Sequence, residues 1–248
     1  MKIIGVIPAR YGSTRFPGKP LADICGKPMI WWVYQQVKKV KAISDVIIAT
    51  DDQHIYDVCM KLSLEVEMTR NDHKTSTERV YEITKKRKAD LYIVINGDEP
   101  LIKPETIEKI IPSGSVSQEF YAANLMTEIK SPAETVDFTN IKVVTDEDSN
   151  ALFMSRSPIP YPKSSVDYKY YKHVGVLIYN INALRFFVTT EKGHNEKIED
   201  INELRFIEHG KKLKMIEVNS ENLSVDTPKD LEHISRIITE RQINEGKN

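Results

Sequence analysis

The chain has 248 residues, with 35 Lys and Arg against 36 Asp and Glu, so its formal net charge is −1, and 40% of its residues are apolar. A net charge near zero with ample apolar content excludes intrinsic disorder and argues against a nucleic-acid-binding surface. Two cysteines, Cys25 and Cys59, cannot build a disulfide framework. The apolar runs are far shorter than the roughly 20 residues that a membrane span needs, and the N-terminus lacks a signal-peptide layout. We expect one domain in a reducing, cytoplasmic setting, with no nucleic-acid or membrane partner.

The first half of the chain alternates apolar strands with amphipathic helices. Short runs rich in β-branched residues predict strands at residues 2–8, 45–50, 65–69 and 91–96. Helices are predicted between them at residues 28–40, from residue 50 or 51 onward, and at residues 76–88. This alternation is typical of a doubly wound α/β fold, with a mostly parallel central sheet and helices on both faces.

From about residue 113 the strands follow one another with fewer helices between them. Strands are predicted at residues 120–128, 141–145, 151–155, 174–179 and 213–218, and helices at residues 181–188 and 196–209. We expect a mixed sheet edge or a smaller lobe that includes the polar stretch 157–172. A last helix is predicted from Thr227 as the N-cap, with Pro228 at the first helical position.

A basic, glycine-containing loop follows the first predicted strand, at residues 9–20. Its cations, hydroxyl side chains and glycines are Arg10, Arg15, Lys19, Ser13, Thr14, Gly12 and Gly18. Ligands of open α/β sheets bind at the carboxyl ends of strands, and backbone N–H groups with Arg and Lys suit a polyphosphate there. The loop is neither G-x-x-x-x-G-K-[ST] nor G-x-G-x-x-G, which argues against a P-loop ATPase and an NAD enzyme. A solvated turn with incidental basic residues is the alternative.

Two aspartates lie next to predicted elements, at positions suited to holding a metal ion. Asp98 comes directly after the strand 91–96, and Asp226 precedes the last helix. Carboxylate oxygens together with substrate phosphates are the ligands that Mg²⁺ prefers. Each residue also has an ordinary reading, Asp98 in a Gly-Asp turn and Asp226 as a complement to the dipole of the last helix.

Taken together, these segments resemble the CMP-Kdo synthetases, the 3-deoxy-manno-octulosonate cytidylyltransferases. The shared motifs are P-A-R-x-x-S-T-R-x-P-G-K-P-L, A-T-D, T-E-R, G-D-E-P and V-D-T-P-x-D-L, in that order from Met1 to about Ile234. The resemblance implies a Rossmann-like nucleotidyltransferase fold, a homodimer and dependence on Mg²⁺. The implied reaction is attack of an acceptor oxygen on the α-phosphorus of CTP, which releases pyrophosphate, in bacterial lipopolysaccharide or capsule biosynthesis.

The resemblance also implies roles for individual residues. Catalysis is assigned to Arg10, Lys19, Asp98 and Asp226, of which Asp98 and Asp226 would hold the metal. Nucleotide binding is assigned to Pro8, Ala9, Arg10, Gly12, Ser13, Arg15, Lys19, Arg70, Thr77 and Gly97. Acceptor binding is assigned to Asn96, Arg156, His173, Leu177, Asn202 and Glu203. The nucleotide-binding part would span about residues 1–112, the acceptor-binding and dimerisation part about 113–220, and the C-terminal helix about 227–243.

The chain departs from the family pattern at the acceptor residues. It has Asn96 where the family has Gln, Leu177 where it has Tyr, and Glu203 where it has Gln. A lost hydroxyl donor can cost several orders of magnitude in discrimination, and an added carboxylate would repel the carboxylate of Kdo. These changes predict an acceptor other than Kdo, such as an amino sugar or a phosphorylated compound like phosphoglutamine; neutral drift is the alternative.

Two other classes of protein stay open at this point. A glycosyltransferase of similar architecture would use an acidic metal motif but consume a nucleotide sugar, whereas the basic loop suits a free triphosphate better. A non-catalytic homologue would be expected to lose a metal carboxylate or the loop lysine, and this chain keeps Asp98, Asp226 and Lys19.

Overall fold

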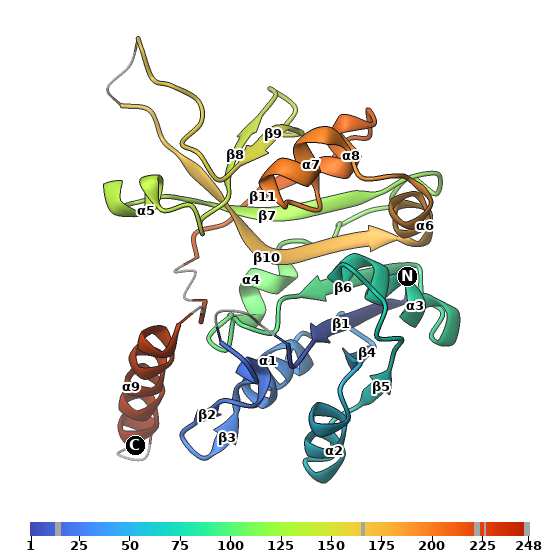
Figure 1. Ribbon diagram of the computed structural model, residues 1–248, viewed down its shortest axis with the longest axis vertical. Coiled ribbons are helices and arrows are strands. Elements are labelled where there is room, and N and C mark those ends of the chain that lie inside the picture. The colour runs from blue at the N-terminus through green and yellow to red at the C-terminus, as the bar shows by residue number, and fades with distance from the viewer. Residues whose placement is uncertain (13–15, 165–166, 221–223, 226, 246–248) are drawn as a thin grey trace.

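The computed structural model describes residues 1–12, 16–164, 167–220, 224–225 and 227–245, with side chains up to residue 240 in the last helix. Within these residues, nine strands form one sheet, and its main path runs β11-β7-β10-β6-β1-β4-β5. Strands from both predicted parts of the chain therefore share one sheet (Figure 1).

The nucleotide half of the sheet is parallel. Its strands are β1 (Ile3–Ala9), β4 (Asp45–Thr50), β5 (Val66–Met68) and β6 (Leu91–Ile95). β1 pairs in parallel with β4 on one side and with β6 on the other. The carboxyl ends of β1 and β6 consequently meet at one edge of the sheet.

One strand runs against its neighbours. β10 (Tyr171–Asn180) pairs antiparallel with β6 and with β7 (Ala122–Glu128), and β11 (Lys214–Glu217) pairs in parallel with β7. The antiparallel pair β8 (Lys142–Thr145) and β9 (Ala151–Ser155) joins the sheet through β10. The fold class predicted from the sequence is confirmed, including the smaller mixed part.

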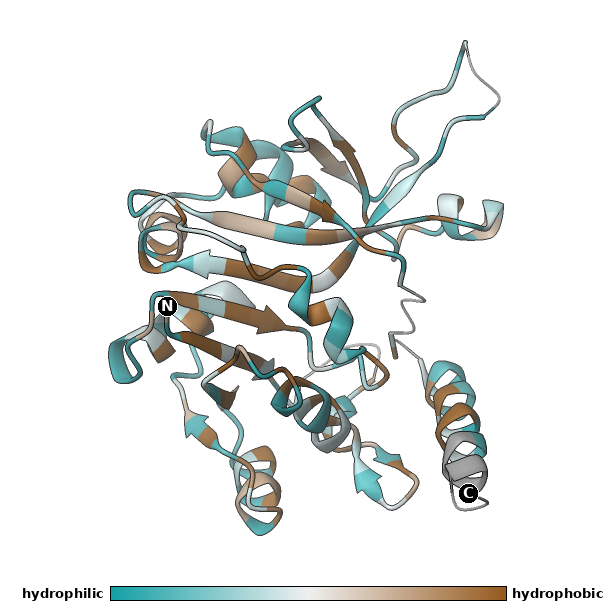
Figure 2. Ribbon diagram, turned by 180° about the vertical axis from the view of Figure 1, so that it is seen from behind, coloured by the Kyte–Doolittle hydropathy of each residue, from teal (hydrophilic) through white to brown (hydrophobic). Residues whose placement is uncertain are grey.

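Helices cover both faces because alternate residues of each strand point to opposite sides. On β1, Ile3 and Ile7 pack on one face, while Ile4 and Val6 pack on the other. The first face is covered by α1 (Met29–Lys38), α2 (Gln53–Lys61) and α4 (Pro104–Glu108). The second is covered by α3 (Ser76–Lys86), α6 (Ile181–Thr189) and α8 (Leu204–Glu208). Figure 2 shows the strands as mostly apolar between more polar helices.

The last helix packs away from the sheet. α9 (Pro228–Glu245) lies beside the small hairpin of β2 (Asp23–Ile24) and β3 (Lys27–Pro28), as Figure 1 shows. A separate apolar cluster joins them and contains Ile24, Met29, Val225, Ile234 and Ile238. The helix begins as predicted, because Thr227 Oγ1 accepts from Asp230 N and Asp230 Oδ2 accepts from Thr227 N.

Several boundaries differ from the predicted ones. α2 is capped by Asp52, one residue later than expected, and Pro28 is the N-cap of α1 instead of its first residue. The short helices α4 and α5 (Pro132–Val136) were not predicted, because five residues are too few for a helical period to show. β10 begins at Tyr171, inside the stretch expected to be irregular, since pairing with β7 and β8 outweighs local polarity.

The predicted helix 196–209 is two helices. α7 (His194–Glu199) ends at Asp200, whose backbone is left-handed with φ of 52°. The buried ion pair between Arg205 Nη2 and Glu196 Oε1, at 2.6 Å, then joins α8 to α7. The apolar periodicity of the segment is continuous across this break, so it gave no sign of two helices. None of the described helices combines the length and apolar content that crossing a bilayer requires.

Candidate active site

A cleft of about 600 Å³ opens at the carboxyl ends of β1 and β6. The predicted site residues that line it are Pro8, Ala9, Arg10, Gly12, Lys19, Asn96, Gly97, Asp98 and Asn202. Arg79, of the T-E-R motif, also lines it. Further lining residues that were not among the predicted site residues include His73, Lys74, Thr75, Ser76, Lys192 and Asp200. The sheet thus brings the basic loop and the Gly-Asp segment together, because the strands before them are neighbours, although Lys19 and Asp98 are 79 residues apart in the chain.

Lys19 joins three segments at the floor of this cleft. Its Nζ lies 2.7 Å from Asp98 Oδ2 and donates to the carbonyl oxygen of Val225 at 2.9 Å. The N–H of Val225 in turn donates to the carbonyl of Asp98 at 2.9 Å. Gly18, with φ of 71°, makes the left-handed turn that directs Lys19 inward. The ammonium group is therefore held in place before any ligand arrives.

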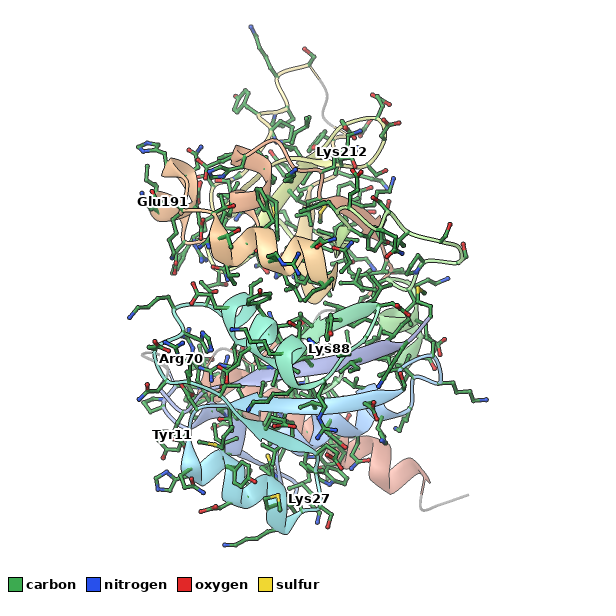
Figure 3. The ribbon with its side chains drawn as sticks, turned by 90° about the vertical axis from the view of Figure 1, so that its right-hand side faces the viewer. Tyr11, Lys27, Arg70, Lys88, Glu191 and Lys212 are labelled. Carbon is green, nitrogen blue, oxygen red and sulfur yellow. The ribbon has the colours of Figure 1, made fainter. Side chains whose placement is uncertain are left out.

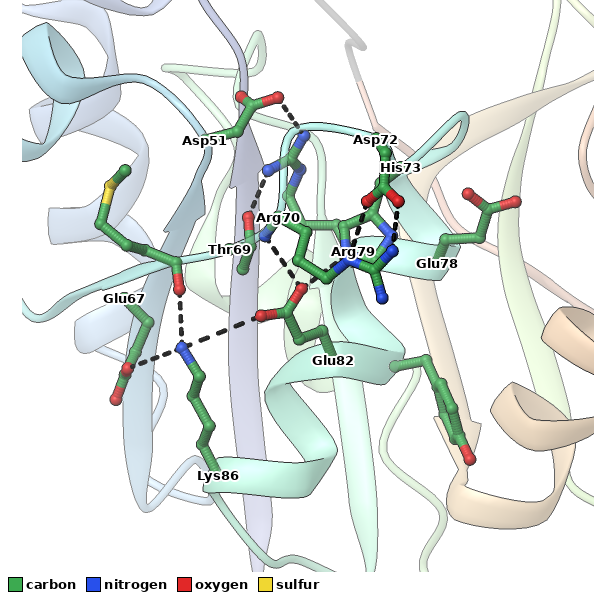
Figure 4. Close-up of polar contacts among 12 residues, drawn as sticks. Asp51, Glu67, Thr69, Arg70, Asp72, His73, Glu78, Arg79, Glu82 and Lys86 are labelled. Carbon is green, nitrogen blue, oxygen red and sulfur yellow. Dashed lines mark hydrogen bonds and ion pairs between the residues drawn. The ribbon is translucent and has the colours of Figure 1, made fainter.

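The segment between β5 and α3 forms a second wall of the cleft. Thr75 caps α3 by accepting from Glu78 N at 3.1 Å, so the N-terminus of this helix opens on the cleft beside Thr75 and Ser76. Arg79 is buried and lies 2.8 Å from Asp51 Oδ2, and it also donates to the Thr69 hydroxyl (Figure 4). The sequence signal for this wall was the position of residues 69–75 directly after a strand of the parallel sheet.

The cleft is predominantly positive. Its lysines and arginines are Arg10, Lys19, Lys74, Arg79 and Lys192, against the carboxylates Asp98 and Asp200. The N-terminus of α3 adds the positive end of a helix dipole and unpaired backbone N–H groups. This arrangement is chemically suited to an anion with several charges, such as a polyphosphate.

Two residues predicted to bind the nucleotide lie elsewhere. The side chain of Arg70 is 70% exposed and pairs with Asp72, while its backbone N–H donates to Glu82 Oε2 at 3.0 Å (Figure 4). It faces a smaller hollow behind the cleft, and Figure 3 shows it on the same edge of the molecule as Tyr11. Thr77 is buried in α3, near the hydroxyl of Tyr179. Ser13, Arg15 and Asp226 lie outside the described residues.

Beside the cleft residue Asn96, the segment after β6 meets β10 at Gly175. Its N–H donates to Glu99 Oε1 at 2.9 Å, and its carbonyl accepts from Asn96 N at 2.8 Å. A Cβ atom on Gly175 would stand 2.5 Å from Glu99 Oε1 and 2.6 Å from Asn96 Nδ2, so glycine is required by this close approach. Burial, and then the charge of Asp98, raise the pKa of Glu99 to about 8, so this carboxyl is mostly protonated at neutral pH.

Known proteins of similar sequence identify the family of this chain. The family model described as "Cytidylyltransferase" matches residues 4–213. The chain belongs to the cytidylyltransferase family. It is 40% identical over 95% of its length to a 3-deoxy-manno-octulosonate cytidylyltransferase of Solibacter usitatus, covering 94% of that protein. It is 38% identical over 96% of its length to the protein of that name from Escherichia coli, covering 97% of it.

Two solved structures resemble this chain in fold. One described as CMP:2-keto-3-deoxy-manno-octonic acid synthetase complexed with CTP matches with a TM-score of 0.89 and 37% identity, covering 97% of this chain and 100% of that one. A 4-diphosphocytidyl-2C-methyl-D-erythritol synthase of Anaerococcus prevotii, at 16% identity and a TM-score of 0.62 over 96% of this chain and 99% of that one, shares the fold. As a member of this family, the chain is a nucleotidyltransferase of the cytidylyltransferase class.

The residues predicted to bind the acceptor of this cytidylyltransferase divide into two groups. Asn96 and Asn202 line the cleft, whereas Arg156, His173, Leu177 and Glu203 are not among its lining residues. Arg156 donates to the carbonyl of Asp200, which is itself at the cleft, at 3.2 Å. Leu177 is 4% exposed and packs in the core on the face covered by α3 and α6.

Glu203 corrects the charge argument drawn from the sequence. It is 8% exposed at the start of α8, and the hydroxyl of Tyr179 is near its carboxyl. Burial raises its pKa to about 7, so near neutral pH about half of the carboxyls are protonated. A buried, partly neutral group that does not line the cleft cannot repel an acceptor carboxylate as a full charge would. The expectation was wrong because sequence alone did not reveal that this position is buried.

The described residues contain no group of three or more metal-ligating side chains. Asp98 nevertheless fits Mg²⁺, because it is a partly exposed carboxylate in a basic cleft, and Mg²⁺ is typically held by one or two carboxylates together with substrate phosphates. The ammonium group of Lys19 lies 2.7 Å from Asp98 Oδ2, so its positive charge already offsets the negative charge of this carboxylate.

The buried carboxyl of Glu203 makes a prediction for stability. The pKa is about 7 in the folded protein against an ordinary value of 4.5, so the wild-type protein should lose stability as pH rises between these values. Glu203→Gln keeps the shape and removes the titration. We expect the variant to gain about 2–3 kcal/mol relative to the wild type between pH 4.5 and pH 8, measured by urea unfolding.

Glu208 provides the matched control on the same helix. Burial alone would raise its pKa, but the N–H groups of Asn195 and Glu196 outweigh this and lower it. Glu208→Gln should therefore lose stability relative to the wild type as pH rises, the opposite trend. Parallel curves for both variants would show that neither carboxyl is perturbed as described.

Proposed function

We propose that this chain transfers CMP from CTP to a Kdo-type sugar acid and releases pyrophosphate, with Mg²⁺ as cofactor. The observation that supports this most strongly is the set of cations that line the cleft at the carboxyl ends of β1 and β6, with Lys19 paired to Asp98. The names of the relatives in the family support the same nucleotide and acceptor. The setting would be the bacterial cytoplasm, in biosynthesis of lipopolysaccharide or capsule.

The residues of the cleft account for the proposed reaction by positioning and charge. Arg10, Lys19 and the N-terminus of α3 would bind the triphosphate and neutralise the departing pyrophosphate. Asp98, with Asp226, would hold Mg²⁺, which when bound neutralises charge on the phosphates. The acceptor oxygen attacks the α-phosphorus directly, so no covalent intermediate on the protein is required.

We propose a sugar acid as the acceptor because the main argument against Kdo, repulsion of its carboxylate by a charged Glu203, does not hold for a buried, partly neutral group. Glu203 is buried and partly neutral, and Leu177 packs in the core. Of the three departures from the family pattern, Asn96 alone lines the cleft. A phosphorylated acceptor, such as phosphoglutamine, is the second candidate, and the cation Lys192 at the cleft favours it.

A pyrophosphate-release assay decides between these acceptors. With CTP as donor, we expect kcat/KM for Kdo to be at least about 10⁵ M⁻¹s⁻¹, which is ordinary for an enzyme with its own substrate. A value at least a hundredfold higher for phosphoglutamine or an amino sugar than for Kdo would instead establish the alternative. Release without any acceptor, or from a nucleotide sugar, would refute the cytidylyl transfer itself.

The basic loop predicts a loss of transition-state stabilisation. Lys19→Ala or Arg10→Ala should lower kcat/KM by roughly 10²–10³, about 3–4 kcal/mol, because each cation offsets charge on the leaving pyrophosphate. Lys27→Ala is the control, because this lysine lies over the ring of Trp31, outside the cleft. Near-normal turnover of both loop variants would contradict the assignment.

If Asp98 and Asp226 hold one metal ion, the losses of turnover on changing each of them should not add. Asp98→Asn and Asp226→Asn should each nearly abolish turnover, and the double variant should lose little more, because both act through one Mg²⁺ site. Asp57→Asn, an exposed carboxylate on α2, is the control. Full activity in EDTA would count against the metal.

A homodimer is proposed from exposed large apolar side chains on the second part of the chain, at Val136, Phe138, Leu152, Tyr161 and Ile198. Phe138 and Ile198 are 66% and 68% exposed. The side chain of Arg156 bonds the carbonyls of Phe138 and Glu199, which places them close together. Exposed large apolar side chains that gather in one region mark an interface.

Light scattering after size-exclusion chromatography tests this surface. We expect a dimer for the wild type and a monomer for the double variant Phe138→Asp, Ile198→Asp, because two buried charges would oppose association. Met60→Asp, an exposed residue on α2, should leave the dimer intact. A wild-type monomer at micromolar concentration would refute the proposal.

A further inference from the structure

β10 is interrupted close to the acceptor end of the cleft. Its register against β7 shifts between His173 and Leu177, so the backbone of residues 174–176 leaves the regular ladder. Backbone groups that leave a ladder need other partners when they are buried. The N–H of Gly175 donates to Glu99, as described above, and the carbonyls of Val174 and Val176 are bonded from the side of β7.

Those two carbonyls accept from one side chain. Asn124 of β7 is completely buried, and its Nδ2 donates to Val174 O at 2.8 Å and to Val176 O at 2.9 Å. Both N–H bonds of the amide are thereby used, which determines the orientation of the group. Its Oδ1 points the other way and lies 2.8 Å from Nδ1 of His173.

This contact determines the protonation of the imidazole. An amide oxygen can only accept, so Nδ1 of His173 carries the hydrogen and donates it to Asn124. In the neutral ring, Nε2 is then the acceptor. Burial lowers the pKa of His173 to about 4, which is consistent with a neutral ring at physiological pH. Within the described part of the chain, Asn124 is the hydrogen-bonding partner of this ring.

His173 lies on β10 two residues before Gly175, and the backbone of Gly175 bonds Glu99 and the cleft residue Asn96. After burial, the charge of Asp98, which raises the pKa of the ring, and that of Arg156, which lowers it, also act on His173. Arg156 itself donates to the carbonyls of Phe138, Glu199 and Asp200, and no ion pair occupies its charge among the described residues.

We infer that Asn124 is a positioning residue for the acceptor: by bonding both carbonyls of the β10 bulge and Nδ1 of His173, it presents Nε2 as an acceptor for a hydroxyl group of the sugar. The inference deepens the proposed function and rests on it. It also defines specificity, because Nε2 pairs with a hydroxyl or another donor. A phosphate or carboxylate oxygen at that point would face a second acceptor without a shared hydrogen.

Nitrogen NMR of the histidine side chains tests the tautomer without reference to activity. In protein labelled with ¹⁵N-histidine, the signals that disappear in His173→Gln identify the residue among the six histidines. We expect a protonated Nδ1 and a bare Nε2 between pH 6 and pH 8. Addition of Kdo should move the Nε2 signal in the direction of an accepted hydrogen bond. A ring protonated on Nε2, or charged at pH 7, would overturn the inference whatever the enzyme's substrate is.

Kinetics test the role of Asn124. In Asn124→Asp the carboxylate still accepts from Nδ1 but cannot donate to the two carbonyls, and its charge favours an imidazolium whose Nε2 donates. We expect the KM for the acceptor to rise at least about tenfold, the loss of one hydrogen bond, while the KM for CTP changes less than about threefold. Equal effects on both substrates would show a structural role alone.

A second pair of variants covers a failure of Asn124→Asp to fold. His173→Phe removes the acceptor atom and should raise the KM for the acceptor at least about tenfold, whereas His173→Gln places an amide oxygen near Nε2 and should recover most of the loss. No difference between the two variants would overturn the inference. If no acceptor supports turnover, the proposed function fails, and the NMR result still decides the tautomer.

Discussion

Three segments that are far apart in the chain depend on one ammonium group. Lys19 Nζ bonds Asp98 Oδ2 and the carbonyl of Val225, and the N–H of Val225 returns to the carbonyl of Asp98. The loop after β1, the end of β6 and the segment before α9 are thereby fixed against one another. A partly buried charge needs such partners, since unpaired charges inside a protein are costly. The same bonds place a cation beside a carboxylate where two parallel strands end. The rest of the cleft depends on this pair.

The antiparallel strand β10 has the corresponding role at the acceptor end. It lies between β6 of the nucleotide part and β7 of the second part, so it connects the two through the sheet. Its bulge would be unfavourable without partners for its backbone groups, and Glu99, Asn96 and Asn124 supply them. Stability and function are therefore coupled here, because the side chains that satisfy the bulge also position His173 and the wall of the cleft.

Much of the fold followed from local patterns, and the errors have identifiable causes. β4 and β9 were predicted with their observed bounds, because short β-branched runs between turn residues are strong signals. The break at Asp200 was missed, because a left-handed residue and a buried ion pair leave the apolar periodicity intact. β10 was predicted too short, because the polar residues Lys172 and His173 find side-chain partners that only the folded chain provides.

The sequence by itself determined the α/β architecture, the cytidylyltransferase family and the meeting of the basic loop with Asp98, because motifs at strand ends carry this information locally. Tertiary structure alone decided the state of the acceptor residues. Burial makes Glu203 partly neutral, and core packing takes Leu177 away from the cleft. The tautomer of His173 depends on Asn124, 49 residues earlier in the chain. Protonation and exposure depend on which distant groups surround a side chain, and no local pattern of residues specifies that.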